Sequence, residues 1–263
     1  MTARITSEQE KQFNRFVEDA ISKARKEVDP DKDGLQRLIE RGGEFQAYVV
    51  AGIARFAAKA PDYDLARTIL GKDFISPEDI MKSRRGFIYT DDQLAQYGDT
   101  VPSQEVLEWC RDNDYMLVAG PNRPMSLLDV RDLKRDHFYS KEGGWYAEQK
   151  FAENDKVDTR WVMLRKGPVL NSTSKNWNEQ QTLLSETEVT PNVAGVAWCV
   201  TTYKAVRNVY LLPGVYVRTS SLDSDGVRVS VGSFDARGLR VSGGWGGRRG
   251  DGLGLASSRK TET

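Results

Sequence analysis

Residues 29–40 have the spacing of oxygen ligands that a calcium ion requires. The stretch DPDKDGLQRLIE matches the pattern D-x-[DN]-x-[DN]-G-x5-E at every specified position. A hard cation takes several oxygen ligands, alternate loop positions point carboxylates inward, and Gly34 permits the sharp turn. The side chains that would bind the ion are Asp29, Asp31, Asp33 and Glu40. The sequence therefore predicts a candidate Ca²⁺ site.

This stretch resembles an EF-hand loop, but it departs from that family at two positions. Gln36 stands where an apolar residue usually joins a partner loop, and Arg37 stands where a small polar residue is usual. The chain has one copy of the motif, whereas EF-hands normally pair. The alternative interpretation is an acidic turn between two helices, with Asp33 and Gly34 in the turn and Glu40 in the second helix.

Residues with catalytic or zinc-binding chemistry are few. His137 is the one histidine, and neither H-x-x-x-H nor C-x-x-C spacing occurs. Cys110 and Cys199 have no base beside them in the sequence, which is typical of buried thiols. The aromatic stretch GGWYAEQKF at 143–151 either lines a pocket or contributes to core and turn. A cytoplasmic enzyme of unrecognised type, using a carboxylate or His137, is therefore kept as an alternative function.

The C-terminal part of the chain has an unusual composition. None of the 55 residues from Ala205 to Arg259 is Lys, Glu, Gln or Met, although these four types make up 44 of the first 204 residues. At that frequency about 12 would be expected. The same stretch holds eight Arg and 11 of the 23 glycines. Strand and turn composition explains part of this bias, but not why every cation is arginine.

Mutagenesis of adenines in AAY codons accounts for the missing residue types. Such codons can encode Asn, Ser, Gly, Arg, Asp, Phe or Val among others, but never Lys, Glu, Gln, Met or Trp. The tail resembles the variable region of diversity-generating retroelement target proteins in the motifs VYVRTSSLDSDGVRV, VGSFDARGL and LGLASSRK. The resemblance covers residues 209–260 and extends more faintly back to Thr190. It implies a C-type-lectin-like fold in which the last strands display mutable residues.

The resemblance divides the tail into a fixed frame and a ligand-binding surface. It implies that the frame is made of alternating apolar residues and turn glycines, with Val229, Val231 and Val241 pointing inward. The ligand-binding residues that it implies are Val227, Ser230, Ser233, Phe234, Arg237, Arg240, Ser242, Gly244, Trp245, Arg248 and Asp251. We expect Phe234, Arg237, Arg240 and Arg248 to share one exposed face that binds a protein or a small-molecule ligand, because Arg offers several planar donors.

Two other interpretations of the tail stay open. Residues 243–254 are also typical of a mobile Gly-rich loop without a binding role. The segment GGWGGRRG resembles RNA-binding RGG segments, but it occurs once and lies between strand-like runs. Nucleic acid is thus an unlikely partner.

Hydrophobic periodicity and capping residues predict the elements that position these residues. A capping box at Ser7 and Glu10 predicts a helix over about 8–28, and a second apolar series of helical period follows to Phe56. Ser76, Thr90 and Ser103 mark further helix starts. From Tyr115 onward short strand-like runs appear, with a helix after Thr190-Pro191 and an antiparallel β tail. We therefore predict an α+β protein with a helical region at 1–112 and a mixed domain at 113–263.

Composition excludes several classes of protein. The 38 basic and 38 acidic residues cancel, which argues against a binder of polyanions over the whole chain. Two cysteines cannot form a disulfide framework, and the first residues lack the features of a signal peptide, so we expect a cytoplasmic protein. No apolar run is long enough to span a membrane. The predicted function is ligand or protein binding, with an enzyme or a phage-associated structural component as alternatives.

Overall fold

The structure, a computed structural model, describes residues 6–57 and 62–260; within 51–57 the only side chain it describes is that of Ile53. The chain forms two compact units, Met1–Lys59 and Ala60–Thr263. The predicted boundary at residue 112 is therefore displaced, because the helices that precede it from Asp64 onward belong to the second unit.

The first unit contains three helices. They are α1 (Ser7–Val28), α2 (Lys32–Glu40) and α3 (Gly42–Ala57). The capping box of α1 is made by Thr6 and Gln9, one residue earlier than the predicted pair, and Thr6 takes the extended backbone conformation that a helix cap needs. Neither α1 nor α2 contains a buried residue, and Phe16 in α1 is 71% exposed.

The second unit is built around a five-stranded sheet with the order β1-β2-β5-β11-β6. Its strands are β1 (Phe74–Ile75), β2 (Tyr115–Ala119), β5 (Trp161–Arg165), β11 (Ser258–Arg259) and β6 (Glu188–Val189). Strands β1 and β2 are parallel, and the other neighbours are antiparallel. All five residues of β2 are buried, which explains the unbroken apolar run in the sequence.

Four helices precede or follow the first strand of this sheet. They are α4 (Asp64–Leu70), α5 (Pro77–Ser83), α6 (Asp91–Asp99) and α7 (Gln104–Asp112), with the 3₁₀ helix η1 (Gly71–Asp73) after α4. Their starts confirm the predicted caps, since the side chains of Ser76, Thr90 and Ser103 each accept a hydrogen bond from a backbone N–H of the following turn. These caps depend on local sequence alone.

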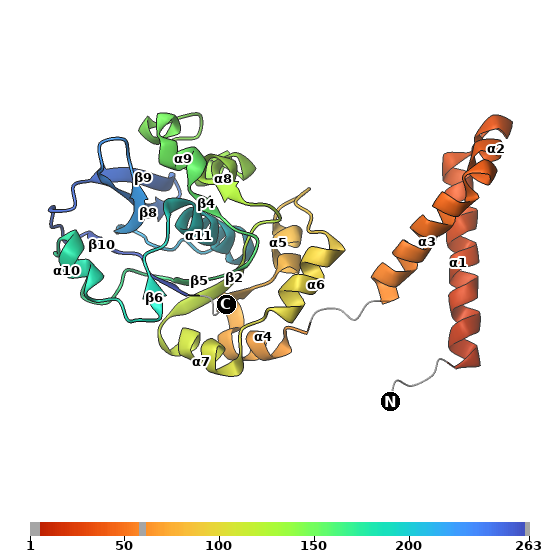
Figure 1. Cartoon of the computed structure of the whole chain (residues 1–263), viewed down its shortest axis with the longest axis horizontal. Helices are drawn as coiled ribbons and strands as arrows, with labels where there is room; N and C mark the ends of the chain where they lie inside the picture. Colours follow the sequence, from red (N-terminus) through yellow and green to blue (C-terminus); the bar gives the residue numbers. More distant parts are fainter. Residues whose placement is uncertain (1–5, 58–61, 261–263) are drawn as a thin grey trace. The chain divides into compact units, whose positions relative to one another are not determined.

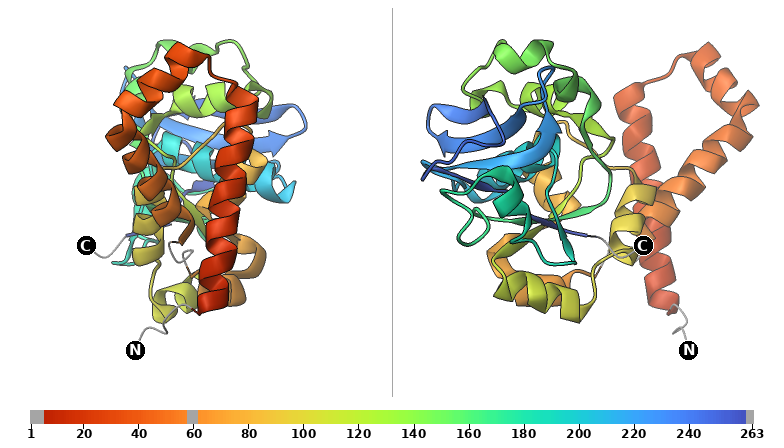
Figure 2. Two further views of the ribbon diagram at one scale, coloured as in Figure 1. Left: turned by 90° about the vertical axis from the view of Figure 1, so that its right-hand side faces the viewer. Right: turned by 60° about the vertical axis from the view of Figure 1, so that its left-hand side comes forward.

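The C-terminal tail forms most of a second sheet with the order β10-β7-β8-β9. Its strands are β7 (Tyr216–Leu222), β8 (Arg228–Asp235), β9 (Gly238–Gly244) and β10 (Leu253–Leu255). In Figure 2 the blue strands of the tail lie next to one another. Strands β7, β8 and β9 are antiparallel as predicted, but β10 is parallel to β7 and β11 joins the other sheet.

This topology fixes the path of the Gly-rich segment (residues 245–252). Strands β9 and β10 run in the same direction at opposite edges of the sheet, so the segment must return across the sheet from one end to the other. The expectation of a wholly antiparallel tail is wrong for this reason: a hairpin turn after Gly244 would have reversed the chain beside β9.

Helix α11 (Val193–Arg207) occupies the middle of the second unit (Figure 1) and contacts strands of both sheets. Every residue from Val193 to Tyr203 is buried, and the Trp198 Nε1–H donates to the carbonyl oxygen of Ala119 in β2 at 2.9 Å. A helix that is apolar on all sides must lie in a core. The observed architecture is thus mixed α and β, consistent with the predicted α+β class.

The remaining elements are short. They are β3 (Met125–Ser126), β4 (Lys156–Val157), α8 (Leu127–Leu133), η2 (Arg135–His137), η3 (Trp145–Glu148), α9 (Lys150–Asn154) and α10 (Trp177–Gln181). Over residues 6–57 and 62–260, none of the helices combines the length and apolarity needed to cross a membrane.

Candidate functional site

Residues 29–40 do not form the predicted calcium loop. Asp29 ends α1 in a left-handed conformation, and the Asp31 side chain accepts a hydrogen bond from the Gly34 N–H at 2.6 Å as the cap of α2. Asp33 and Glu40 both lie within α2, about 10 Å apart along the helix axis at 1.5 Å per residue. In the described parts of the chain, no group of three or more His, Cys, Asp or Glu residues is arranged to hold a metal ion. The same spacing of acidic residues serves here to cap two helices.

The candidate nucleophiles and bases lie apart from one another. Burial raises the pKa of Cys110 to about 12 and also raises the pKa of Cys199, so both thiols stay protonated at neutral pH. His137 is half-buried, and its Nδ1 has no hydrogen-bond partner. Its ring meets the ring of Phe234 edge to face, with the centroids 6.2 Å apart. The side chain of His137 is therefore part of the packing beneath the tail sheet.

We expect His137 to make the stability of the protein depend on pH. Burial and the charges of Arg84, Lys134 and Lys204 lower its pKa to about 4, whereas an unfolded chain has the ordinary value of about 6.5. The unfolded state therefore binds the proton first, and stability is lost as the pH falls from about 6.5 to 4. After allowance for solvent screening at a half-exposed ring, the loss attributable to His137 should be about 1–2 kcal/mol.

Urea unfolding at pH 7 and pH 4.5 measures this loss. Acidic residues also titrate in this range, so the wild type is compared with His137→Gln, which cannot take up the proton. We expect the free energy of unfolding to fall less between pH 7 and pH 4.5 in the variant than in the wild type. Equal falls in the two proteins would contradict the assignment to His137.

The frame of the tail sheet matches the prediction. Val229 and Val231 are fully buried, and Val241 packs partly buried against the core. Gly238 has a φ of 108°, and an added Cβ would lie 2.4 Å from the backbone of Phe138, so the β8–β9 turn needs glycine at this position. These strands hold the surface residues in fixed positions.

Three of the predicted ligand-binding residues are buried instead of exposed. Phe234 is 0% exposed and packs against Tyr210 with the ring centroids 4.9 Å apart. The pairing of β8 with β9 shifts between Gly232 and Asp235, and Ser233 has a φ of 45°. This bulge adds one residue to β8, which turns Phe234 toward the core. The prediction of its exposure is therefore wrong.

The other two buried residues lie under neighbouring parts of the chain. Ser230 is in register with Arg218, and its hydroxyl donates to the carbonyl oxygen of Ser242 at 3.1 Å. Arg218, on the same face, donates to the carbonyl oxygens of Trp245 and Arg248, so the Gly-rich segment passes over this face of the sheet. Val227 is 8% exposed at the start of β8. A sequence pattern of alternating residues cannot show that the outer face of a sheet is covered by a later segment.

Most residues of the predicted set that are not buried lie in two groups at opposite ends of the β8–β9 pair. Arg237 and Arg240 lie near the turn and form ion pairs with Asp235, at 2.8 Å and 3.5 Å. Trp245 and Arg248 follow the other end of β9. Ser233 accompanies the first group, Ser242 is half-buried within β9, Gly244 ends β9, and Asp251 is exposed in the Gly-rich segment. The single face expected for Phe234, Arg237, Arg240 and Arg248 is not formed.

A shallow hollow of about 410 Å³ lies at the second end. Its lining residues are Trp145, Asp223, Val227, Gly243, Gly244, Trp245 and Arg248. Trp145 is 43% exposed and Trp245 is 68% exposed. The sequence indicated Trp145 only as part of an aromatic stretch, because nothing local shows that residues 143–151 meet β9.

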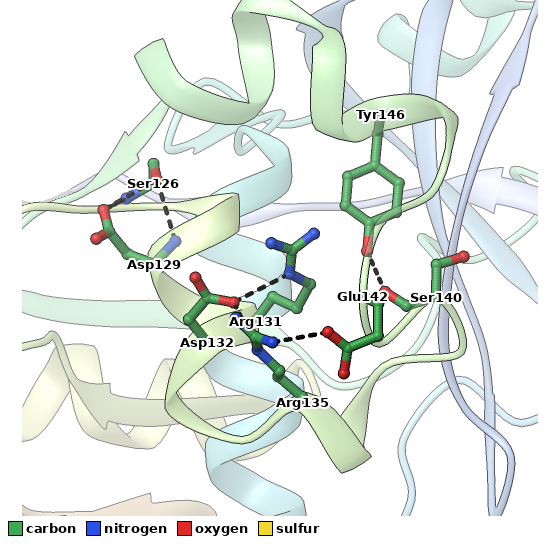
Figure 3. Close-up of polar contacts among 8 residues, drawn as sticks. All are labelled: Ser126, Asp129, Arg131, Asp132, Arg135, Ser140, Glu142 and Tyr146. Carbon is green, nitrogen blue, oxygen red and sulfur yellow. Dashed lines mark hydrogen bonds and ion pairs between the residues drawn. The ribbon is translucent and has the colours of Figure 1, made fainter.

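The side chain of Trp145 is held against β9. Its Nε1–H donates to the carbonyl oxygen of Val241 in β9 at 3.0 Å. Figure 3 shows the polar contacts that fix the segment before Trp145: the Tyr146 hydroxyl donates to the Ser140 carbonyl oxygen at 3.3 Å, and Arg135 donates to Glu142 at 2.9 Å. One wall of the hollow is thus tied to β9, and the segment before it is tied to η2.

The opposite wall is held by a buried arginine. Arg218 is 0% exposed, and its guanidinium donates to the carbonyl oxygens of Trp245 and Arg248 in the Gly-rich segment. It also donates to the Lys175 carbonyl oxygen and to the side-chain oxygen of Gln180, at 3.1 Å and 2.9 Å. A single side chain therefore ties the Gly-rich segment to residues 175–180.

Further bonds fix the same segment along its length. The N–H of Trp177 donates to the Gly246 carbonyl oxygen, and the N–H of Ser174 donates to the Gly250 carbonyl oxygen, each at 2.8 Å. Arg249 forms an ion pair with Glu179 at 2.6 Å. Trp245 and Arg248 therefore project from a backbone that these bonds anchor.

Comparison with known proteins gives no relative for this chain. No protein family, no curated protein and no solved structure matches it.

Proposed function

We propose that this protein binds a protein or peptide partner in the hollow between Trp145 and Trp245. The observation that carries the proposal is this pair of exposed tryptophans on anchored backbone. Tryptophan is among the residues that contribute most to binding energy at interfaces, because it buries a large area with few rotatable bonds. Since both walls are fixed before binding, little conformational entropy is lost on association. The open, shallow shape favours a projecting side chain or short segment over an enclosed small molecule.

We further propose that the tail is a C-type-lectin-like display surface of the kind that diversity-generating retroelements vary. Gly243, Gly244 and Arg248 line the hollow, and each is a residue type that mutated AAY codons encode. Arg218 and Val229 are buried and would stay constant. Changes at the lining positions would alter the partner without loss of the frame. A near-copy of the tail's coding sequence next to a reverse transcriptase gene, differing at adenines, would support this; uniform differences at all bases would count against it.

Selection from a random dodecapeptide library tests the binding proposal. We expect the wild-type protein to enrich a set of peptides that Trp245→Ala fails to enrich, because the substitution removes one wall of the hollow. Trp245 is exposed and its backbone bonds are retained, so the variant should fold. Tyr139→Ala, which removes another exposed aromatic side chain outside the hollow, should enrich the wild-type set. Identical sets from wild type and Trp245→Ala would overturn the proposal.

A further inference from the structure

The arginines of strands β7–β9, of the β8–β9 turn and of the Gly-rich segment differ in whether a carboxylate neutralises them. Arg237 and Arg240 pair with Asp235, and Arg249 pairs with Glu179. Among the described residues, Arg218, Arg228 and Arg248 form no ion pair. Arg218 bonds to neutral oxygens, and the guanidinium of Arg228 donates to the Ser220 carbonyl oxygen.

Of these three arginines, Arg228 lies at the adjoining end of β8 and the other two lie at the hollow. Arg248 lines it, and Arg218 lies directly under the carbonyl groups of Trp245 and Arg248. Arg228 is in register with Gly244, and its guanidinium lies 3.9 Å from the centroid of the Trp177 ring. Within β7–β9 and the Gly-rich segment, the arginines without an ion pair therefore lie toward this end of the sheet.

Arg218 strengthens the positive potential of the hollow. It is fully buried, and its Nε has no hydrogen-bond partner. A buried charge without a counter-ion is screened weakly, so its field reaches the groups just above it. Burial lowers the pKa of Arg218, and the nearby charge of Arg248 lowers it further, as expected for two cations close together.

One carboxylate, Asp223, opposes these charges within the lining. Its Oδ1 accepts the backbone N–H groups of Asp225 and Val227, at 3.0 Å and 2.8 Å. The carboxylate is therefore used to fix the turn between β7 and β8. Within the lining, one arginine, Arg248, faces one carboxylate, Asp223, and the buried Arg218 against the Gly-rich segment adds a positive charge that no carboxylate of the described residues neutralises.

We propose that the hollow binds an acidic peptide segment. Arg248 holds a carboxylate of this segment, and apolar side chains of the same segment pack against Trp145 and Trp245. This inference rests on the proposed function. An arginine fork binds a carboxylate through two parallel hydrogen bonds. Gly244 has no atom within 4 Å of the position of an added Cβ, so a peptide backbone can approach β9 there. The segment would thus contribute a charged and an apolar side chain side by side.

The same dodecapeptide selection, run on four proteins, tests the inference. We expect the wild-type set to be rich in Asp and Glu next to aromatic or aliphatic residues. The set from Arg248→Gln should lose its acidic residues. Asp223→Asn keeps the oxygen that fixes the turn and removes the opposing charge, so its set should be more acidic. Arg237→Gln is the matched control, because that arginine is exposed and already paired, and its set should equal that of the wild type.

Affinities of the most enriched peptide, made synthetically, give a second measurement. We expect Arg248→Gln to weaken binding about five- to tenfold, Asp223→Asn to tighten it about two- to threefold, and Arg237→Gln to leave it unchanged. Binding should also weaken as NaCl rises, since the pair is solvent-accessible. If the enriched peptides are lost in Trp245→Ala but are neutral or basic, the inference is overturned and the proposed function stands. A set that does not depend on Trp245 would overturn the function itself.

Discussion

Replacement of Arg218 with methionine is expected to lower the free energy of unfolding by about 3 kcal/mol and to release the Gly-rich segment from residues 174–180. The guanidinium donates to four oxygens, three of them backbone carbonyls, and methionine fills a similar volume without any donor. Each buried acceptor left without a partner costs about 1–3 kcal/mol, but water can reach the loop once it opens, so the costs do not simply add. Removal of the buried charge itself offsets part of the loss.

Urea unfolding measures the change in stability, and amide hydrogen exchange locates it. The N–H groups of Ser174 and Trp177 donate to the Gly-rich segment, so their exchange should speed up at least tenfold in the variant, whereas amides within β8 should change only with global stability. Arg237→Met is the matched control and should change stability by less than about 0.5 kcal/mol, because that side chain is exposed. Unaltered exchange at both amides in Arg218→Met would show that other contacts hold the segment.

The caps and the buried elements of the second unit could be predicted because they depend on neighbours in the sequence. Ser76 and Thr90 begin helices through bonds to residues three positions away, and the unbroken apolar run of β2 indicates burial on both faces. The prediction of a calcium loop also depended on neighbours in the sequence, but it was wrong. A cap at Asp31 and a helix through Glu40 satisfy the spacing as well as an ion does, and only tertiary structure separates the two.

The candidate site could be predicted in part, because its residues come from distant segments. The resemblance of the tail implied Trp245 and Arg248 as ligand-binding residues, and both are exposed. It gave no sign that Trp145 would lie beside β9, about a hundred positions later in the chain, or that residues 245–252 would cross the sheet and cover Ser230. The domain boundary was misplaced for a similar reason, since α4–α7 belong to the unit that contains the sheets.

Replacement of Val231 with aspartate is expected to unfold the second unit, whereas the same change at Ser233, two positions along the strand, should be nearly neutral. In a regular strand these residues would share a face. Val231 is 0% exposed in the core, and a buried carboxylate without a partner costs several kcal/mol, a large part of the stability of a domain. The bulge after Gly232 turns Ser233 away from the core, where its oxygens accept hydrogen bonds from Arg240 at 2.6 Å and 3.0 Å.

Circular dichroism and thermal unfolding distinguish the two variants. Aspartate tolerates the positive φ of residue 233 and places a charge beside Arg240, so Ser233→Asp should melt within about 2 °C of the wild type. Val231→Asp should lack a cooperative transition. If both variants unfolded, β8 would be a regular strand and Phe234 would lie on the outer face. The proposed binding surface at the Trp145–Trp245 end of the sheet would then lose its structural basis. The contrast between adjacent positions of one face therefore tests the bulge and, through it, the surface that the tail presents.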